Sequence, residues 1–117
     1  MVNLAYATTL LGLGLAPQIP GLGTAVSDGL VHAIASGAQA LMLFWLLIVA
    51  VSPMPAVIFS GLGATLFGGT IEVLQMLQPS RYFQVSDLEA NAVGSILVCI
   101  AISLTLVFNR HHRGRTR

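Results

Sequence analysis

Side chains that could bind a ligand or move a proton are gathered in a few short segments of an otherwise apolar chain. The candidates are Asp28, His32, Glu72, Gln75, Arg81, Asp87 and Asn91. Residues three or four apart share one face of a helix, so the first two, the next two and the last two would each point in one direction. Carboxylates, amides and an imidazole can bind hydroxyl or amide groups, or act as general acid and base. A guanidinium can hold phosphate or carboxylate through two parallel hydrogen bonds.

The same residues do not favour a metal or cofactor site by their spacing. They include one histidine, and the chain contains neither H-x-x-x-H nor E-x-x-H. A single cysteine, Cys99, lies in an apolar run and leaves no intrachain disulfide available. We therefore expect no cofactor and no metal.

The composition places these side chains in a membrane protein. Of the 117 residues, 56% are hydrophobic and 8% are charged, whereas about 25% are charged in an average soluble domain. A soluble protein of this size could not cover its surface with so few charges. The predicted class is an all-α integral membrane protein.

Apolar segments separated by prolines and glycines predict four transmembrane helices. They cover residues 1–16, 30–51, 56–77 and 86–108. The last three are long enough to cross about 30 Å of hydrocarbon. The first is shorter than the usual ~20 residues, so we expect a short transmembrane helix, with an interfacial or re-entrant segment as the alternative. Ser86 and Glu89 form an S-x-x-E pattern that predicts a capping box at the start of the fourth helix.

The last residues predict the orientation. Four arginines lie within residues 110–117, and basic residues beside a span stay on the cytoplasmic side. We expect a transmembrane domain over residues 1–108 and a basic cytoplasmic tail over 109–117, in the cytoplasmic membrane of a bacterium. The polar segment 71–94 would then face outward.

Helical spacing also predicts that the polar segments meet. Ser60, Ala64, Gly68 and Glu72 recur every four residues, and a stripe of small residues lets another helix approach closely. Glu72 lies roughly 10 Å inside its helix end, and His32 lies about 6 Å inside its own. These depths predict one outward-facing polar pocket. A charged group inside a membrane is costly unless it is paired or faces a cavity.

The pattern of residues in this segment resembles the VanZ-like family of small bacterial membrane proteins. The matching residues are Ile71-Glu72-x-x-Gln75, Pro79-x-Arg81-x-Phe83 and Ser86-Asp87-Leu88-x-Ala90-Asn91-x-x-Gly94. An earlier motif of the family, Asp-Lys-x-x-His-Phe, corresponds to residues 28–33, where Gly29 and Ala33 replace the lysine and phenylalanine. The resemblance covers about residues 27–100. It implies four transmembrane helices, an association with glycopeptide resistance, and the seven candidate residues as motif positions.

Three hypotheses follow for function. In the first, the pocket binds the polar headgroup of a membrane lipid or a lipid-linked cell-envelope precursor, with Arg81 holding an anionic group. In the second, the protein is an intramembrane enzyme acting on a lipid-linked substrate, with His32 or Glu72 as general base and Asp28 or Asp87 orienting the histidine. It has no obvious nucleophile, and Ser36 is a candidate only if it lies within reach of His32. In the third, it is a non-catalytic subunit of a larger membrane complex, and the polar residues hold the fold together. Nucleic-acid binding has no support, because only four arginines cluster and they adjoin a membrane-spanning segment.

Overall fold

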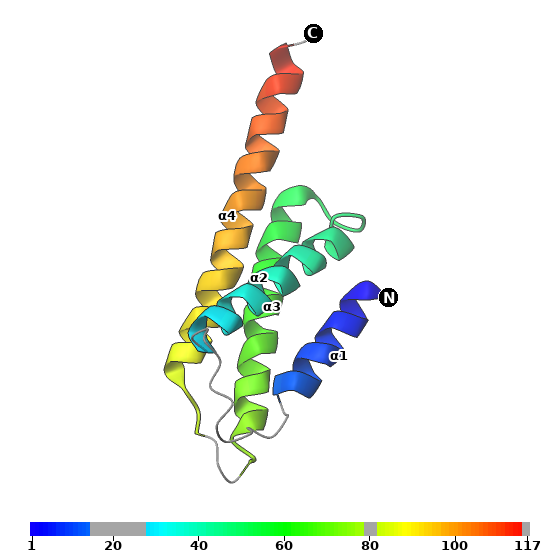
Figure 1. The fold of residues 1–117 in the computed structure, drawn as a ribbon. Helices are drawn as coiled ribbons and strands as arrows, with labels where there is room; N and C mark the ends of the chain where they lie inside the picture. The colour runs from blue at the N-terminus through cyan, green and yellow to red at the C-terminus, as the bar shows by residue number, and fades with distance from the viewer. Residues whose placement is uncertain (15–27, 79–81, 116–117) are drawn as a thin grey trace.

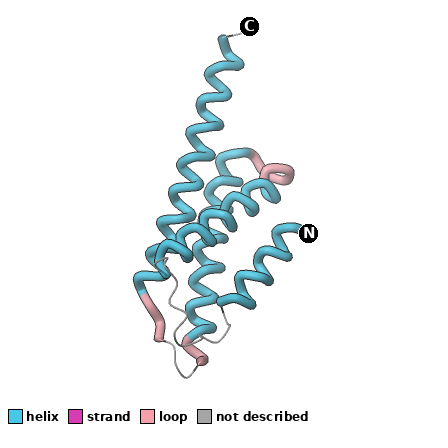
Figure 2. Tube along the Cα trace, in the orientation of Figure 1, coloured by secondary structure: helices cyan, strands magenta, loops and turns pink. Residues whose placement is uncertain are grey.

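Four helices make up the fold. The computed structural model describes residues 1–14, 28–78 and 82–115. The helices are α1 (Val2–Gly14), α2 (Asp28–Leu47), α3 (Pro53–Gln75) and α4 (Val85–Arg115) (Figure 1), and the described residues contain no β-strand (Figure 2). α2, α3 and α4 are each long and apolar enough to cross a membrane. The predicted all-α, multi-pass membrane fold is confirmed. With 13 residues, α1 extends only about 20 Å, so it is short, as predicted.

The boundaries of all four helices differ from the predicted ranges, most of all at the C-terminal end of α4. α3 begins at Pro53, because a proline is well suited to the first helical position, where its missing N–H is not needed. α4 continues to Arg115, so the predicted helix end near Phe108 is wrong. No proline interrupts this segment, and arginines near a helix C-terminus interact favourably with the helix dipole.

The predicted capping box at the start of α4 is also wrong. The helix begins at Val85, and the carbonyl of Gln84 already accepts the N–H groups of Asp87 and Leu88, at 3.1 and 3.4 Å. Ser86 is therefore inside the first turn instead of preceding it. Asp87 does lie in that first turn, where a negative charge is favoured by the helix dipole.

α4 packs against the two other long helices. It contacts both α2 and α3, which also pack against each other, while α1 lies against α2 and α3 (Figure 1). The crossing of α2 and α4 depends on a glycine, because a Cβ atom at Gly94 would overlap the carbonyl oxygen of Ala33. Beside this crossing, the hydroxyls of Ser36 and Ser95 are 2.6 Å apart. Glycine and serine here allow the two backbones to approach closely, as small residues do between membrane helices.

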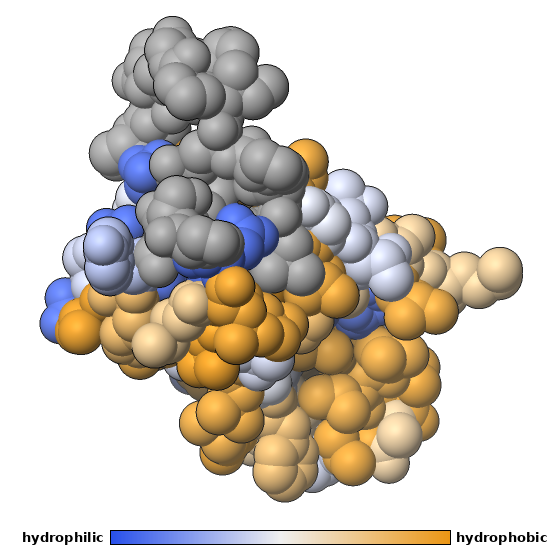
Figure 3. Space-filling view, turned by 90° about the horizontal axis from the view of Figure 1, so that it is seen from below, coloured by the Kyte–Doolittle hydropathy of each residue, from blue (hydrophilic) through white to orange (hydrophobic). Residues whose placement is uncertain are grey.

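The outer surface of the bundle is apolar. Large hydrophobic side chains are exposed on each long helix, including Trp45, Leu66 and Leu104 at 66%, 71% and 65%. Figure 3 shows hydrophobic residues over broad areas of the molecule seen from below, with hydrophilic residues in a narrower band. Exposing so much apolar surface to water would be unfavourable in free energy, whereas the hydrocarbon chains of a lipid bilayer can cover it.

The interior is divided between an apolar end and a polar end. Phe44, Ala56 and Val57 form a buried core where the end of α2 meets the start of α3. The opposite end, near the start of α2 and α4 and the end of α3, buries polar side chains. The predicted stripe on α3 is confirmed as an inward face, since Ser60, Ala64 and Glu72 are all buried. The fold therefore positions the polar residues at one end of the bundle.

Candidate functional site

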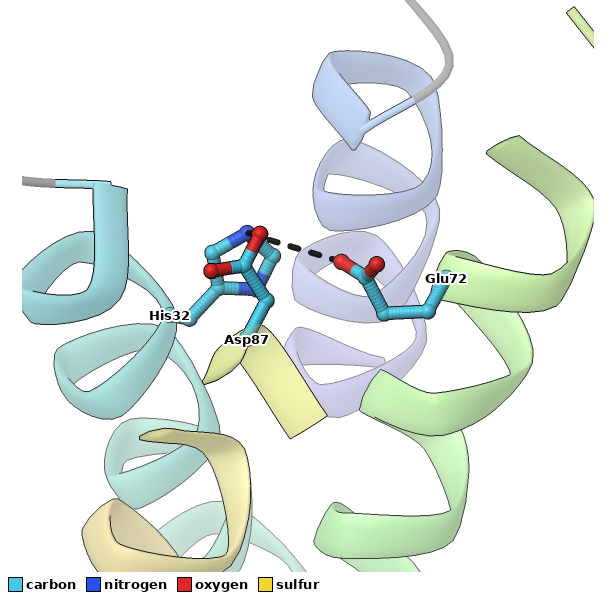
Figure 4. A group of neighbouring side chains, drawn as sticks. All are labelled: His32, Glu72 and Asp87. Carbon is cyan, nitrogen blue, oxygen red and sulfur yellow. Dashed lines mark ion pairs between the residues drawn. The ribbon is translucent and has the colours of Figure 1, made fainter. Parts of the chain in front are cut away.

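A histidine and two carboxylates from three different helices converge at the polar end. His32 comes from α2, Glu72 from α3 and Asp87 from α4, and Figure 4 shows their side chains directed toward one another. His32 Nε2 lies 3.7 Å from Glu72 Oε1 and 3.6 Å from Asp87 Oδ2. The two carboxylates are buried, whereas the histidine side chain is 24% exposed. The structure thus brings together three of the seven residues predicted from the sequence, and we refer to them as the acid–histidine cluster.

Two members of the acid–histidine cluster, His32 and Asp87, line a cavity of about 440 Å³, and Glu72 is buried beside His32. The polar wall of the cavity includes His32, Gln75, Asp87 and Asn91, and its apolar wall includes side chains from α1, α2 and α3. The apolar lining residues are Leu10, Leu13, Val31, Ala35, Ala64, Phe67 and Ile71. Small-molecule pockets in proteins span about 300–1,000 Å³ and combine an apolar lining with a few polar groups. This cavity has both properties, so it can accept a molecule with one polar and one apolar part.

The other predicted residues lie at different distances from the cluster. Gln75 and Asn91 are buried and line the cavity, and Asp28 lines it while remaining exposed. Arg81 lies outside the described residues. Asn91 packs directly on Gly68, where a Cβ atom would come within 2.6 Å of its amide group. The small residue on α3 therefore makes room for a polar side chain on α4.

Sequence reasoning missed the part that α1 plays in the cavity. Asn3 accepts a hydrogen bond from Gln39 Nε2 at 3.0 Å, and the Tyr6 hydroxyl donates to the carbonyl of Ala35 at 3.1 Å. These bonds hold α1 against α2, so that Leu10 and Leu13 form one wall of the cavity. The signal in the sequence was a single asparagine in an apolar segment, together with a glutamine on the polar face of the second span.

The serine considered as a nucleophile is bonded elsewhere. Ser95 donates its proton to the carbonyl of Asn91 at 2.9 Å, so the 2.6 Å contact between the serine hydroxyls is donated by Ser36. The Ser36 hydroxyl is thus directed toward α4 and not toward His32. A serine–histidine pair of the kind used in acyl transfer is not formed by these residues.

His32 lies close to two carboxylates, but both distances are too long for a hydrogen bond. Hydrogen bonds from N–H to oxygen span about 2.7–3.2 Å, which is shorter than both distances at His32. The cluster can hold a donor group of a ligand between its oxygens, or a cation among its three ligand atoms. All three atoms lie within 4.8 Å of one another.

Comparisons with known proteins leave the chain's relationships open. No family model, curated protein or solved structure matches it.

Proposed function

We propose that this chain is a VanZ-like protein of the bacterial cytoplasmic membrane whose cavity binds the polar headgroup of a lipid-linked cell-envelope precursor. The observation that carries the proposal is the cavity itself. It joins a polar wall containing His32 and Asp87 to an apolar wall contributed largely by α1, α2 and α3. A lipid has the same division between a polar and an apolar part.

The lining suggests which headgroup chemistry would bind. Carboxylates accept hydrogen bonds from hydroxyl and amide N–H groups, and the side-chain amides of Gln75 and Asn91 can both donate and accept them. Sugars and peptides of envelope precursors present these groups in large numbers. In the proposal, Arg81 contacts the anionic linkage of the same molecule.

The charge distribution supports an outward-facing site. Four of the five basic residues lie within residues 110–117, where α4 ends, and the positive-inside rule places such residues in the cytoplasm. The acid–histidine cluster lies at the opposite end of the bundle, near the first turn of α4. It would then open to the outer leaflet, where envelope precursors are used.

The experiment is native mass spectrometry of the full chain released from nanodiscs that contain a small fraction of a polyprenyl-diphosphate-linked sugar. We expect the wild-type protein to retain this lipid in preference to phosphatidylglycerol, and Glu72→Gln to retain at most about a tenth as much, since a buried charged partner contributes on the order of 1.5–3 kcal/mol. Glu89→Gln is the matched control, because it removes the same charge from an exposed position on α4.

Two outcomes would contradict the proposal. Equal retention by the two variants would show that the lipid binds elsewhere on the surface. Retention of every lipid in proportion to its abundance would show that the cavity does not distinguish headgroups. Release of a shortened or hydrolysed lipid by the wild-type protein would favour the intramembrane enzyme instead.

A further inference from the structure

The three ligand atoms of the acid–histidine cluster lie within 4.8 Å of one another, close enough for one metal ion to draw them together. The distances from His32 Nε2 to the two carboxylate oxygens are 3.6 and 3.7 Å. Four ligands at about 2.0–2.2 Å from a tetrahedral Zn²⁺ lie about 3.4 Å from one another. The two distances at His32 are therefore only a few tenths of an ångström longer than those in a zinc site, and they are too long for direct hydrogen bonds from the imidazole.

An unsatisfied buried amide provides a second, independent observation. Asn91 is 3% exposed, and its Nδ2 atom has no hydrogen-bond partner among the described residues. It lies one helical turn beyond Asp87, on the same face of α4, and lines the same cavity as Asp87 and His32. A buried polar group without a partner costs about 1–3 kcal/mol. A ligand or metal-bound water at this place would give it one, since the side-chain amide can donate through its nitrogen or accept through its oxygen.

The charges of the cluster also fit a divalent cation. Two carboxylates, one neutral imidazole and one divalent cation sum to zero, which suits a site among apolar helices where net charge is costly. Imidazole favours transition metals, whereas Mg²⁺ and Ca²⁺ favour oxygen ligands alone. Three protein ligands with an open fourth position are typical of zinc sites that bind a further molecule.

We propose that His32, Glu72 and Asp87 bind one divalent transition-metal ion of the Zn²⁺ type, with its open coordination position facing the cavity. The metal site rests on the spacing and chemistry of these side chains and does not require the proposed lipid. If both proposals hold, the ion would contact the anionic linkage of the headgroup.

The test measures Zn²⁺ binding to the full chain in nanodiscs made of a zwitterionic lipid. The starting protein carries His111→Asn and His112→Asn, because this pair near the C-terminus could bind zinc on its own. We expect about one Zn²⁺ per chain by metal analysis after gel filtration, and a Kd that a large excess of Mg²⁺ leaves unchanged. His32→Ala, Glu72→Gln and Asp87→Asn should each weaken binding by about 100-fold or more, since even residues outside the ligand shell contribute 10–100-fold. Glu89→Gln should bind as the starting protein does.

X-ray absorption at the zinc edge of the starting protein provides a readout that does not depend on the folding of the variants at His32, Glu72 or Asp87. We expect nitrogen and oxygen neighbours at about 2.0–2.2 Å, the signature of one imidazole, and no sulfur at about 2.3 Å. Loss of all zinc on removing the two C-terminal histidines, or a shell without imidazole, would overturn the metal site. Zinc binding without retention of any lipid would leave the metal site intact and contradict the headgroup proposal alone.

Discussion

Replacing Gly94 by alanine tests whether the crossing of α2 and α4 positions the cluster. A Cβ atom there would lie 2.6 Å from the Ala33 carbonyl carbon and closer still to its oxygen, where ordinary contact begins at 3.4 Å. The two helices must therefore separate by more than 0.8 Å, the difference between those distances (3.4 − 2.6). Overpacking of this kind costs about 1–3 kcal/mol, and lengthening the serine–serine hydrogen bond beside it costs about 1 kcal/mol more. The better helix propensity of alanine returns about 1 kcal/mol. The net expectation is a loss of about 1–3 kcal/mol in the free energy of unfolding.

The assay is reversible unfolding in mixed detergent micelles, followed by circular dichroism. Gly29→Ala is the matched control on the same helix pair, because a Cβ there meets the Ala90 Cβ at 3.8 Å, an ordinary contact. We expect it to leave the free energy of unfolding unchanged or to raise it by up to about 1 kcal/mol. Equal effects of the two substitutions would refute the argument that close approach at Gly94 sets the crossing.

The remaining predictions concern two contacts near the cavity. Gly68→Ala should lower the free energy of unfolding by about 1 kcal/mol or more, because the new Cβ would lie 2.6 Å from the Asn91 side-chain amide and displace it. The same substitution in an Asn91→Ala background should lower the free energy of unfolding only slightly. An equal loss in both backgrounds would contradict the contact. Ser36→Ala and Ser95→Ala, combined in a double-mutant cycle, should show a coupling energy of about 0.5–1.5 kcal/mol. A coupling near zero in the same unfolding assay would show that the 2.6 Å contact contributes nothing to stability.

The sequence predicts much of the fold and part of the site. The four helices follow from long apolar segments bounded by proline and glycine, and the inward face of α3 follows from its small residues at every fourth position. The helix rise also predicts that His32 and Glu72 share one pocket, and the structure places His32 Nε2 3.7 Å from Glu72 Oε1. These features depend on local periodicity and on the rise of a helix, which a sequence shows directly.

Other features depend on contacts between distant segments and could not be predicted in this way. Metal-ligand motifs in a sequence depend on spacing within one helix, whereas His32, Glu72 and Asp87 come from three helices. The wall formed by α1 depends on the hydrogen bond between Asn3 and Gln39, which are 36 residues apart. α4 continues beyond the predicted end near Phe108 because a polar composition alone does not end a helix, and arginine is a good helix former.

The central claim is that the acid–histidine cluster binds a ligand and is not a latch that holds the helices together. The free energy of unfolding of Glu72→Gln, measured beside that of Glu89→Gln in ligand-free micelles, tests this claim most directly. A binding site is not optimised for stability, so we expect Glu72→Gln to change the free energy of unfolding by less than about 1 kcal/mol while it loses zinc and lipid. A loss of about 3–5 kcal/mol, as when a buried ion pair is broken, with no such loss for Glu89→Gln, would contradict the account and identify the cluster as structural.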